Sequence, residues 1–524
     1  MATGAELTYQ TNASALAMAN TIFGSGVTVN GASYSGPSGS SAIYSNGGLS
    51  TGVVPSTSGV ILSTGNVTNF TQSSGDPNRS SGTSTDTSGA NNNALFNAIA
   101  GTNTYDAVWL DVDFTPVGDT MTMSFVFSSE EYPEYINSQF NDVVGVWVNG
   151  THVPITVGNG ITSVNNINGN TQQNLFVNNT NDAYNTEMDG FTITLSLTMP
   201  VNPGVLNSIR IGVADASDSA YDSNLLIGGD SVQTTLVALD DSVNLNPTGT
   251  KTIDVLANDI APSGATLTIT HINGIAVSAG STIVLPSGQT VKLNADGTFE
   301  ITGDGQIETK NFTYTVSDGL GHSDIGFVKI NSIPCFVSGT AIRTPNGEVM
   351  VESLLPGDLV ITHDDGPQPL RWIGRRKVAA TGSFAPVHIR ANTFGNHRAL
   401  MVSPLHRILI RDSLAELLFG ESEVLIAAKD LVNDRSIRYV PGGEVEYVHL
   451  LFDQHQVVFA EGLATESFLP GPQTSKSFEA EILAEICALF PEIDPNTGRG
   501  YSPAVRRTLR PFEAQLLLTP RKAA

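Results

Sequence analysis

The chain has 524 residues, more than one hydrophobic core normally holds, so several domains are expected. Apolar residues make up 40% of it, charged residues only 14%, and there are 51 glycines. This composition is typical of β-domains with many turns and excludes a disordered chain or a helical bundle. No apolar run reaches the roughly 20 residues that a membrane-spanning helix needs. The N-terminus lacks the basic start and apolar stretch of a classical signal peptide.

Charge is distributed unevenly along the chain. The only basic residues before Lys251 are Arg79 and Arg210, whereas 19 of the 25 Lys and Arg follow Cys335. An acidic, nearly lysine-free front argues against nucleic acid and anionic membranes as partners. The acidic N-terminal part favours cations as partners or a saline extracellular medium. The two cysteines, Cys335 and Cys487, exclude a disulfide framework, and the helical apolar spacing around Cys487 favours a small core residue.

Residues 1–233 alternate short apolar runs with Gly, Ser and Asn turns. The segments 121–127 and 143–148 and the alternating stretch 208–213 read as strands. This predicts an antiparallel β-sandwich.

Acidic residues stand beside these strands: Glu130, Glu131, Asp142, Asp215, Asp218 and Asp222. Their hard oxygen atoms are the ligands that Ca²⁺ prefers, so they are candidate calcium ligands. The alternative is that they cap turns and keep strand edges soluble. The sequence shows no regular calcium-loop spacing that would decide between the two.

The acidic strings also carry a resemblance. Residues 128–135 read Ser-Ser-Glu-Glu-Tyr-Pro-Glu-Tyr, 189–192 Asp-Gly-Phe-Thr, and 214–223 Ala-Asp-Ala-Ser-Asp-Ser-Ala-Tyr-Asp-Ser. Together they resemble the choice-of-anchor L domain of bacterial surface proteins. The resemblance implies a secreted or cell-surface location, reached without a classical signal peptide, and leaves an extracellular surface or a glycan open as partner.

Residues 234–333 predict a second, seven-strand sandwich, because strand-like runs alternate with turn signals about every ten residues. The strings at 254–259 and 312–319 resemble the cadherin-like or Ig-like repeats of large bacterial adhesins. This region is interpreted as a rigid spacer.

A third region begins at residue 334. Residues 333–342 read Ile-Pro-Cys-Phe-Val-Ser-Gly-Thr-Ala-Ile, 356–360 Pro-Gly-Asp-Leu-Val and 403–410 Ser-Pro-Leu-His-Arg-Ile-Leu-Ile. With a last string at 447–462, these resemble the Hint module shared by Hedgehog C-terminal domains and inteins. The resemblance implies an all-β horseshoe over 334–475. The helical spacing of apolar residues after it predicts a short helical tail at 476–524. The expected fold class is therefore mainly β and multidomain.

The resemblance implies autocatalytic cleavage of the Pro334–Cys335 bond without a cofactor. A thiolate at Cys335 would attack the Pro334 carbonyl and form a thioester. His406 is the candidate proton donor for the departing amine, because an unperturbed imidazole titrates near neutral pH. Ser403 stands where the family has Thr and can bond the scissile amide.

Two more residues match positions of the family that assist the nucleophile or the second step, namely Asp453 and His455. The histidines His388, His397 and His449 lack such a context and are expected to be structural or on the surface.

No His-Asn pair follows the last string, so splicing is not expected. The expected acceptors of the passenger are water, a thiol or a surface amine, and the sequence does not choose among them. The competing reading is a non-enzymatic adhesin or calcium-binding surface protein with an inactive Hint domain.

Overall fold

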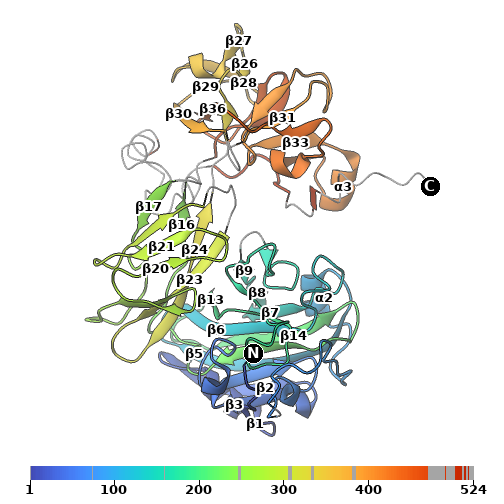
Figure 1. Ribbon diagram of the computed structural model, residues 1–524, viewed down its shortest axis with the longest axis vertical. Helices are drawn as coiled ribbons and strands as arrows, with labels where there is room; N and C mark the ends of the chain where they lie inside the picture. Colours follow the sequence, from blue (N-terminus) through green and yellow to red (C-terminus); the bar gives the residue numbers. More distant parts are fainter. Residues whose placement is uncertain are drawn as a thin grey trace, which may run out of the picture. The chain divides into compact units, whose positions relative to one another are not determined.

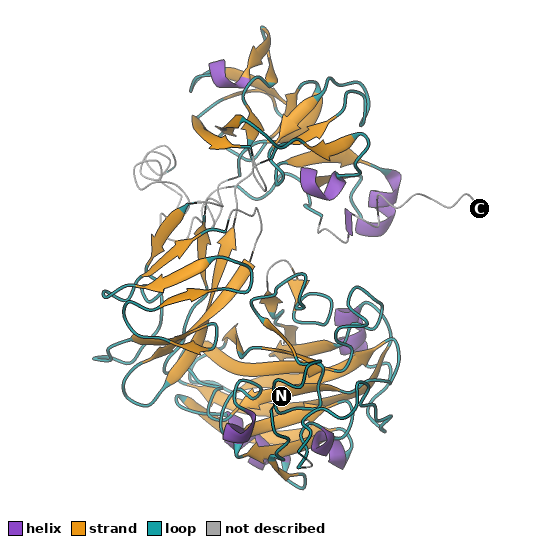
Figure 2. Cartoon of the chain, viewed as in Figure 1, coloured by secondary structure: helices purple, strands orange, loops and turns teal. Residues whose placement is uncertain are grey.

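The computed structural model describes residues 2–73, 75–157, 160–245, 249–304, 310–331, 335–380, 385–469, 490, 502–509, 513–514 and 517. Their regular secondary structure is mainly β-strand, with a few short helices, as predicted (Figures 1 and 2). The chain divides into two compact units, one built mainly from residues before 330 and the other mainly from residues after it. No helix among the described residues is long and apolar enough to span a membrane.

The N-terminal sandwich consists of two main sheets. An eight-stranded sheet has the order β1-β3-β4-β15-β6-β12-β11, with β13 also paired to β6, and a five-stranded sheet has the order β2-β5-β14-β7-β8. The strands of the first sheet are β1 Thr8–Gln10, β3 Ser41–Ser45, β4 Gly59–Ser63, β6 Thr120–Ser129, β11 Phe176–Asn178, β12 Gly190–Thr192, β13 Leu195–Pro200 and β15 Ser223–Gly228. Those of the second are β2 Val27–Ser35, β5 Thr104–Pro116, β7 Val143–Val148, β8 Thr151–His152 and β14 Asn207–Ala216. A separate hairpin joins β9 Thr156–Val157 to β10 Gly160–Ile161.

The three strands expected from periodicity are β6, β7 and β14. Alternate residues of these strands point into one core, in which Phe125, Phe127 and Ile211 are fully buried. Burying a side chain of this size stabilises the fold by about 1.5–3 kcal/mol. Helix α1 (Ala15–Ile22), capped by the Ser14 hydroxyl, adds its apolar face to the same core. Helix α2 (Ala94–Ala100) ends at Gly101, whose φ of 70° is one that glycine adopts without strain.

The second sandwich has nine strands rather than the seven predicted, because short edge strands add to each sheet. The sheets have the orders β16-β24-β23-β18-β19 and β17-β22-β21-β20. Their bounds are β16 Asp241–Asn244, β17 Thr250–Ile253, β18 Thr268–Ile272, β19 Ile275–Ala276, β20 Thr282–Val284, β21 Thr290–Leu293, β22 Phe299–Thr302, β23 Lys310–Ser317 and β24 Ser323–Asn331.

The C-terminal module contains a six-stranded sheet of order β30-β36-β25-β32-β31-β35. Its second sheet has the order β27-β26-β37-β38-β33-β34, with β28 paired to both β29 and β37. The strands are β25 Phe336–Val337, β26 Ala341–Thr344, β27 Gly347–Met350, β28 Leu359–Thr362, β29 Gly366–Pro369, β30 Trp372–Ala379, β31 Val387–Ile389, β32 Leu400–Val402, β33 Arg407–Arg411, β34 Glu423–Ala427, β35 Ile437–Tyr439, β36 Glu444–Leu451, β37 Val457–Ala460 and β38 Leu463–Glu466. Helix α3 (Ser413–Phe419) is capped by the Asp412 carboxylate and ends at Gly420.

Of the predicted helical tail, Glu513, Ala514 and Leu517 are helical, whereas residues 502–509 contain no helix. Cys487 and Pro334 lie outside the described residues.

Candidate active site of the C-terminal module

The pairing of the short strand β25 determines what surrounds Cys335. Phe336 of β25 lies opposite Val402 of β32 on one side and Val448 of β36 on the other, both in antiparallel register. In an antiparallel pair, the residue before Phe336 faces the residue after each partner. The register therefore places Cys335 beside Ser403 and His449.

Hydrogen bonds connect Cys335 to both neighbours. Its backbone N–H donates to the Ser403 hydroxyl oxygen at 2.7 Å, and the Ser403 N–H donates to the Cys335 carbonyl at 2.9 Å. The Cys335 thiol sulfur lies 3.4 Å from His449 Nε2. The backbone nitrogen and the thiol of Cys335 thus each have a polar partner, although Cys335 is only 8% exposed.

Aromatic rings hold the His449 imidazole in place. The Trp372 ring stacks on it with centroids 6.5 Å apart, and the Phe468 ring meets it edge-on at 5.3 Å. Gly374 lies opposite His449 on the neighbouring strand β30. A Cβ at Gly374 would overlap the Trp372 indole, so only glycine leaves room for the stacked ring.

His449 was expected from the sequence to be structural or on the surface, and its contact with the thiol was not anticipated. A signal was present, because Val445, Tyr447 and His449 alternate along β36 and therefore share one face. Val445 and Tyr447 pack with Cys335 in one cluster. The strand pairing that makes this face the Cys335 face is not visible in the sequence.

His406 occupies the loop that leads from Ser403 into β33. Its N–H donates to the Ser403 carbonyl at 3.0 Å, and its ring lies 4.3 Å from the Phe336 ring. The side chain is 2% exposed, and Nε2 has no hydrogen-bond partner among the described residues. Burial lowers the pKa of His406 to about 4, with Glu466 opposing the shift. The imidazole is therefore neutral near pH 7, which differs from the unperturbed titration assumed from the sequence.

The lowered pKa of His406 makes the module sensitive to acid. The unfolded imidazole binds a proton below about pH 6.5, whereas the folded one does so only below about pH 4. The neutral His406 imidazole therefore makes its full contribution to the free energy of unfolding above pH 6.5. This contribution, about 3 kcal/mol in total, is lost as the pH falls to 4. In an NMR titration of histidine-labelled protein, one imidazole should titrate near pH 4, and this signal should be absent from His406→Gln. If all the imidazoles titrate near pH 6.5, His406 is not desolvated as described.

A buried charge network of Glu466 and Arg407 lies close to His406. The Glu466 carboxylate accepts hydrogen bonds from the Arg407 N–H at 2.9 Å and from its guanidinium at 2.8 Å. Burial alone would raise the pKa of Glu466, but Arg407 and the neighbouring His455 outweigh it and lower the pKa to about 2. Glu466 is therefore ionised and favours a proton on His406.

The predicted residue His455 belongs to this network. Its Nε2 lies 3.2 Å from the Ser467 carbonyl and 3.6 Å from the Glu466 carboxylate. Its Nδ1 accepts a hydrogen bond from the Val505 N–H at 3.1 Å. An Nδ1 that accepts leaves the imidazole proton on Nε2, which fits donation to Ser467. Both ring nitrogens of His455 are thus engaged away from the thiol.

Asp453 has no contact with Cys335, Ser403 or His449 among the interactions of the described residues. Its side chain is 51% exposed and forms a surface ion pair with Arg371 at 2.7 Å. The structure thus brings Cys335, Ser403 and His449 into direct contact and places His406 next to them. His455 joins indirectly through Glu466, and Asp453 does not join.

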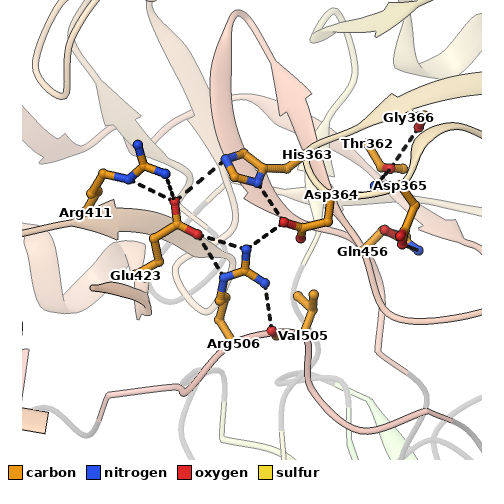
Figure 3. Close-up of polar contacts among 10 residues, drawn as sticks. All are labelled: Thr362, His363, Asp364, Asp365, Gly366, Arg411, Glu423, Gln456, Val505 and Arg506. Carbon is orange, nitrogen blue, oxygen red and sulfur yellow. Dashed lines mark hydrogen bonds and ion pairs between the residues drawn. The ribbon is translucent and has the colours of Figure 1, made fainter. Parts of the chain in front are cut away.

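Residues 502–509, which are far from Cys335 in the sequence, pack against strand β34 of the module. Leu425 of β34 exchanges backbone hydrogen bonds with Arg507 and Leu509. Figure 3 shows the side-chain contacts nearby, where Arg506 bonds Glu423 and Asp364 while His363 and Arg411 approach the same two carboxylates. The Arg506 pairs are 2.9 Å and 2.7 Å long. This segment therefore pairs with β34, the last strand of the second sheet, and its Val505 N–H donates to His455.

The six acidic residues proposed as calcium ligands lie in the N-terminal sandwich. All except Asp218 are buried. Within the described part of the chain, no three His, Cys, Asp or Glu side chains are already arranged as a metal-ligand set.

Comparisons with known protein families divide the chain into three parts. Residues 7–233 match the choice-of-anchor L domain, residues 233–331 a bacterial Ig domain and residues 334–472 the Hint domain. The second sandwich is thus matched as an Ig domain rather than as a cadherin repeat. Comparison with curated proteins gave no match.

Similar solved structures include inteins. The Msm DnaB1 intein splicing domain bound with zinc is 14% identical, and the match covers 25% of this chain and 98% of that chain with a TM-score of 0.18. The gp41-1 intein is 13% identical, and the match covers 25% of this chain and 97% of that chain with a TM-score of 0.17. At TM-scores this low, assignment of the module rests on the family model alone.

Proposed function

Because the chain carries a choice-of-anchor L domain, a bacterial Ig domain and a Hint domain, we propose that it is a self-processing surface or secreted protein. The Hint domain cleaves the bond between Pro334 and Cys335 and so separates the β-rich passenger from the module. The contact of the Cys335 thiol with His449, directly before strand β25, carries this proposal.

The first step activates the thiol. His449 Nε2, 3.4 Å from the sulfur, takes the thiol proton, and the thiolate attacks the Pro334 carbonyl carbon. The rings of Trp372 and Phe468 hold the imidazole beside the sulfur. The conformational entropy of orienting the imidazole is therefore lost on folding and does not add to the reaction barrier.

The second step breaks the amide. The Ser403 hydroxyl holds the Cys335 N–H at 2.7 Å and thereby fixes the orientation of the scissile amide. When the carbon–nitrogen bond breaks, the Cys335 nitrogen needs one proton, and the proton that His449 removed from the thiol balances this step. We assign its transfer to His406, which is neutral near pH 7 and therefore must first receive that proton. An imidazolium with a pKa of about 4 then donates it readily. The products are a Pro334 thioester on the Cys335 sulfur and a free Cys335 amine.

The thioester is then hydrolysed or transferred to an outside thiol or amine. Splicing does not follow, because no His-Asn pair ends the module sequence. The second candidate, a Hint domain that has lost its activity and only packs or binds, is favoured by one observation. Cys335 is only 8% exposed, so an acceptor reaches the thioester only if the surroundings open.

Hydroxylamine separates these candidates, because it captures thioesters and leaves ordinary amides intact. After incubation of the full chain, mass spectrometry should find a hydroxamate at the Pro334 carboxyl group and a second fragment that begins at Cys335. The Cys335→Ala chain, treated in parallel, should remain whole. Fragments with a free Pro334 acid that form equally in Cys335→Ala would exclude the thioester.

A further inference from the structure

Four strand ends of the N-terminal sandwich meet at one place. Ser223, the first residue of β15, lies opposite Ser129, the last residue of β6. In the other sheet Ala214, near the end of β14, lies opposite Val143, the first residue of β7. Asp142 connects the two sheets here, because it accepts hydrogen bonds from the Ser223 hydroxyl at 2.6 Å and from the Ala216 N–H at 2.9 Å.

Acidic side chains gather at these strand ends. We call them the strand-end cluster, and its members are Asp106, Glu130, Glu131, Asp142, Asp215 and Asp222. All are buried, at 3% exposure or less. Asp106 was not among the residues selected from the sequence. The two arginines of the first 250 residues lie elsewhere, with Arg210 paired to Asp111 and Arg79 beside Glu187.

Three members of the strand-end cluster have donors on both oxygens. Glu130 accepts from the N–H groups of Thr83 and Asp189, and Asp222 accepts from the N–H and hydroxyl of Thr85. Asp142 accepts from Ala216 and Ser223. These three carboxylates therefore connect segments that lie far apart in the sequence.

The other three members each keep an unsatisfied oxygen. Asp215 Oδ1, Glu131 Oε2 and Asp106 Oδ1 have no hydrogen-bond partner among the described residues. Asp215 lies among the charges of Asp142, Asp222 and Asp106, while Glu131 lies beside Asp142. Burial, followed by these like charges, raises the pKa of Asp215 and Glu131, so leaving the carboxylates uncompensated is costly.

We propose that the strand-end cluster binds one Ca²⁺ ion, with Asp215 as its central ligand. The further carboxylate ligands available are the free oxygens of Asp106, whose charge acts on Asp215, and of Glu131, whose neighbour is Asp142. Ca²⁺ accepts six to eight oxygens in flexible geometry, including backbone carbonyls and water, and so does not need three carboxylates set in advance. Mg²⁺ requires a near-octahedral site and suits this loop-built position less well.

The proposal is independent of cleavage and is tested with full-length Cys335→Ala protein. After removal of divalent ions, the melting temperature of the sandwich should rise with the logarithm of the CaCl₂ concentration, by roughly 5 °C or more at a hundredfold excess over Kd. The same concentration of MgCl₂ should give a smaller shift. Asp215→Asn should lose the response to calcium, whereas Asp113→Asn, which changes an exposed acid on β5, should keep it.

The competing explanation is that protons neutralise the strand-end cluster. In that case calcium gives no shift, and Asp215→Asn melts higher than its parent at neutral pH because the fold no longer has to bind a proton at this carboxyl group. That pair of results would overturn the proposal. Should Asp215→Asn fail to fold, Glu131→Gln together with calorimetric titration of the parent protein decides the matter, since binding of about one ion per chain is required.

Discussion

Cleavage before Cys335 should slow by about 10²- to 10⁴-fold when His449 is replaced by glutamine, the range expected for loss of a general base. Glutamine keeps a polar side chain of similar length at the stacked position between Trp372 and Phe468, but it cannot take the thiol proton. The rate is measured by intact mass spectrometry after addition of a thiol to purified protein.

A matched control separates this effect from a general loss of stability. His388 lies on β31 of the same sheet and is half-buried, and its replacement by glutamine should leave the rate unchanged. An unchanged rate in His449→Gln would show that the thiol is activated by another group, and His406 would then be the next candidate.

Replacement of Glu466 by glutamine should destabilise the module by about 3 kcal/mol at neutral pH. Removing one partner of a buried ion pair costs about 3–5 kcal/mol, and the lower end applies because the Arg407 side chain is 31% exposed. Hydrogen exchange of peptides from β33 and β38, followed at one fixed pH, measures the change locally. The same substitution should lower the pKa of His406 further, because the Glu466 charge raises it.

The exposed pair of Glu348 and Arg398 is the reference for this experiment. Glu348 is 38% exposed and Arg398 is 55% exposed, so Glu348→Gln should cost less than about 1 kcal/mol. Equal effects of the two substitutions would mean that Glu466 has no special role beneath His406.

Much of the architecture could be predicted from local patterns. The alternation at 121–127 and 143–148 follows from strands with a buried face, and both segments are strands of the sandwich core. The strings around Cys335 and at 403–410 predicted the Hint fold, to which residues 334–472 match. Local periodicity was sufficient here because each signal lies within one strand.

The contacts of the site could not be predicted in the same way. The approach of His449 to Cys335 depends on the pairing of β25 with β36, two segments more than 100 residues apart. The low pKa of His406 depends on burial by the assembled module, which no local spacing reveals. Likewise, the sequence selected acidic residues but not their donors. The satisfied oxygens of Glu130 and Asp222 depend on the distant Thr83 and Thr85.

Self-cleavage is tested most directly by the mass of the chain over time. Purified full-length protein, incubated with a thiol at neutral pH, should yield two fragments, 1–334 and 335–524, and Cys335→Ala should yield neither. A wild-type chain that stays whole while its Cys335 thiol is shown to react with an alkylating reagent would contradict the account, because the nucleophile would then be accessible and still inactive.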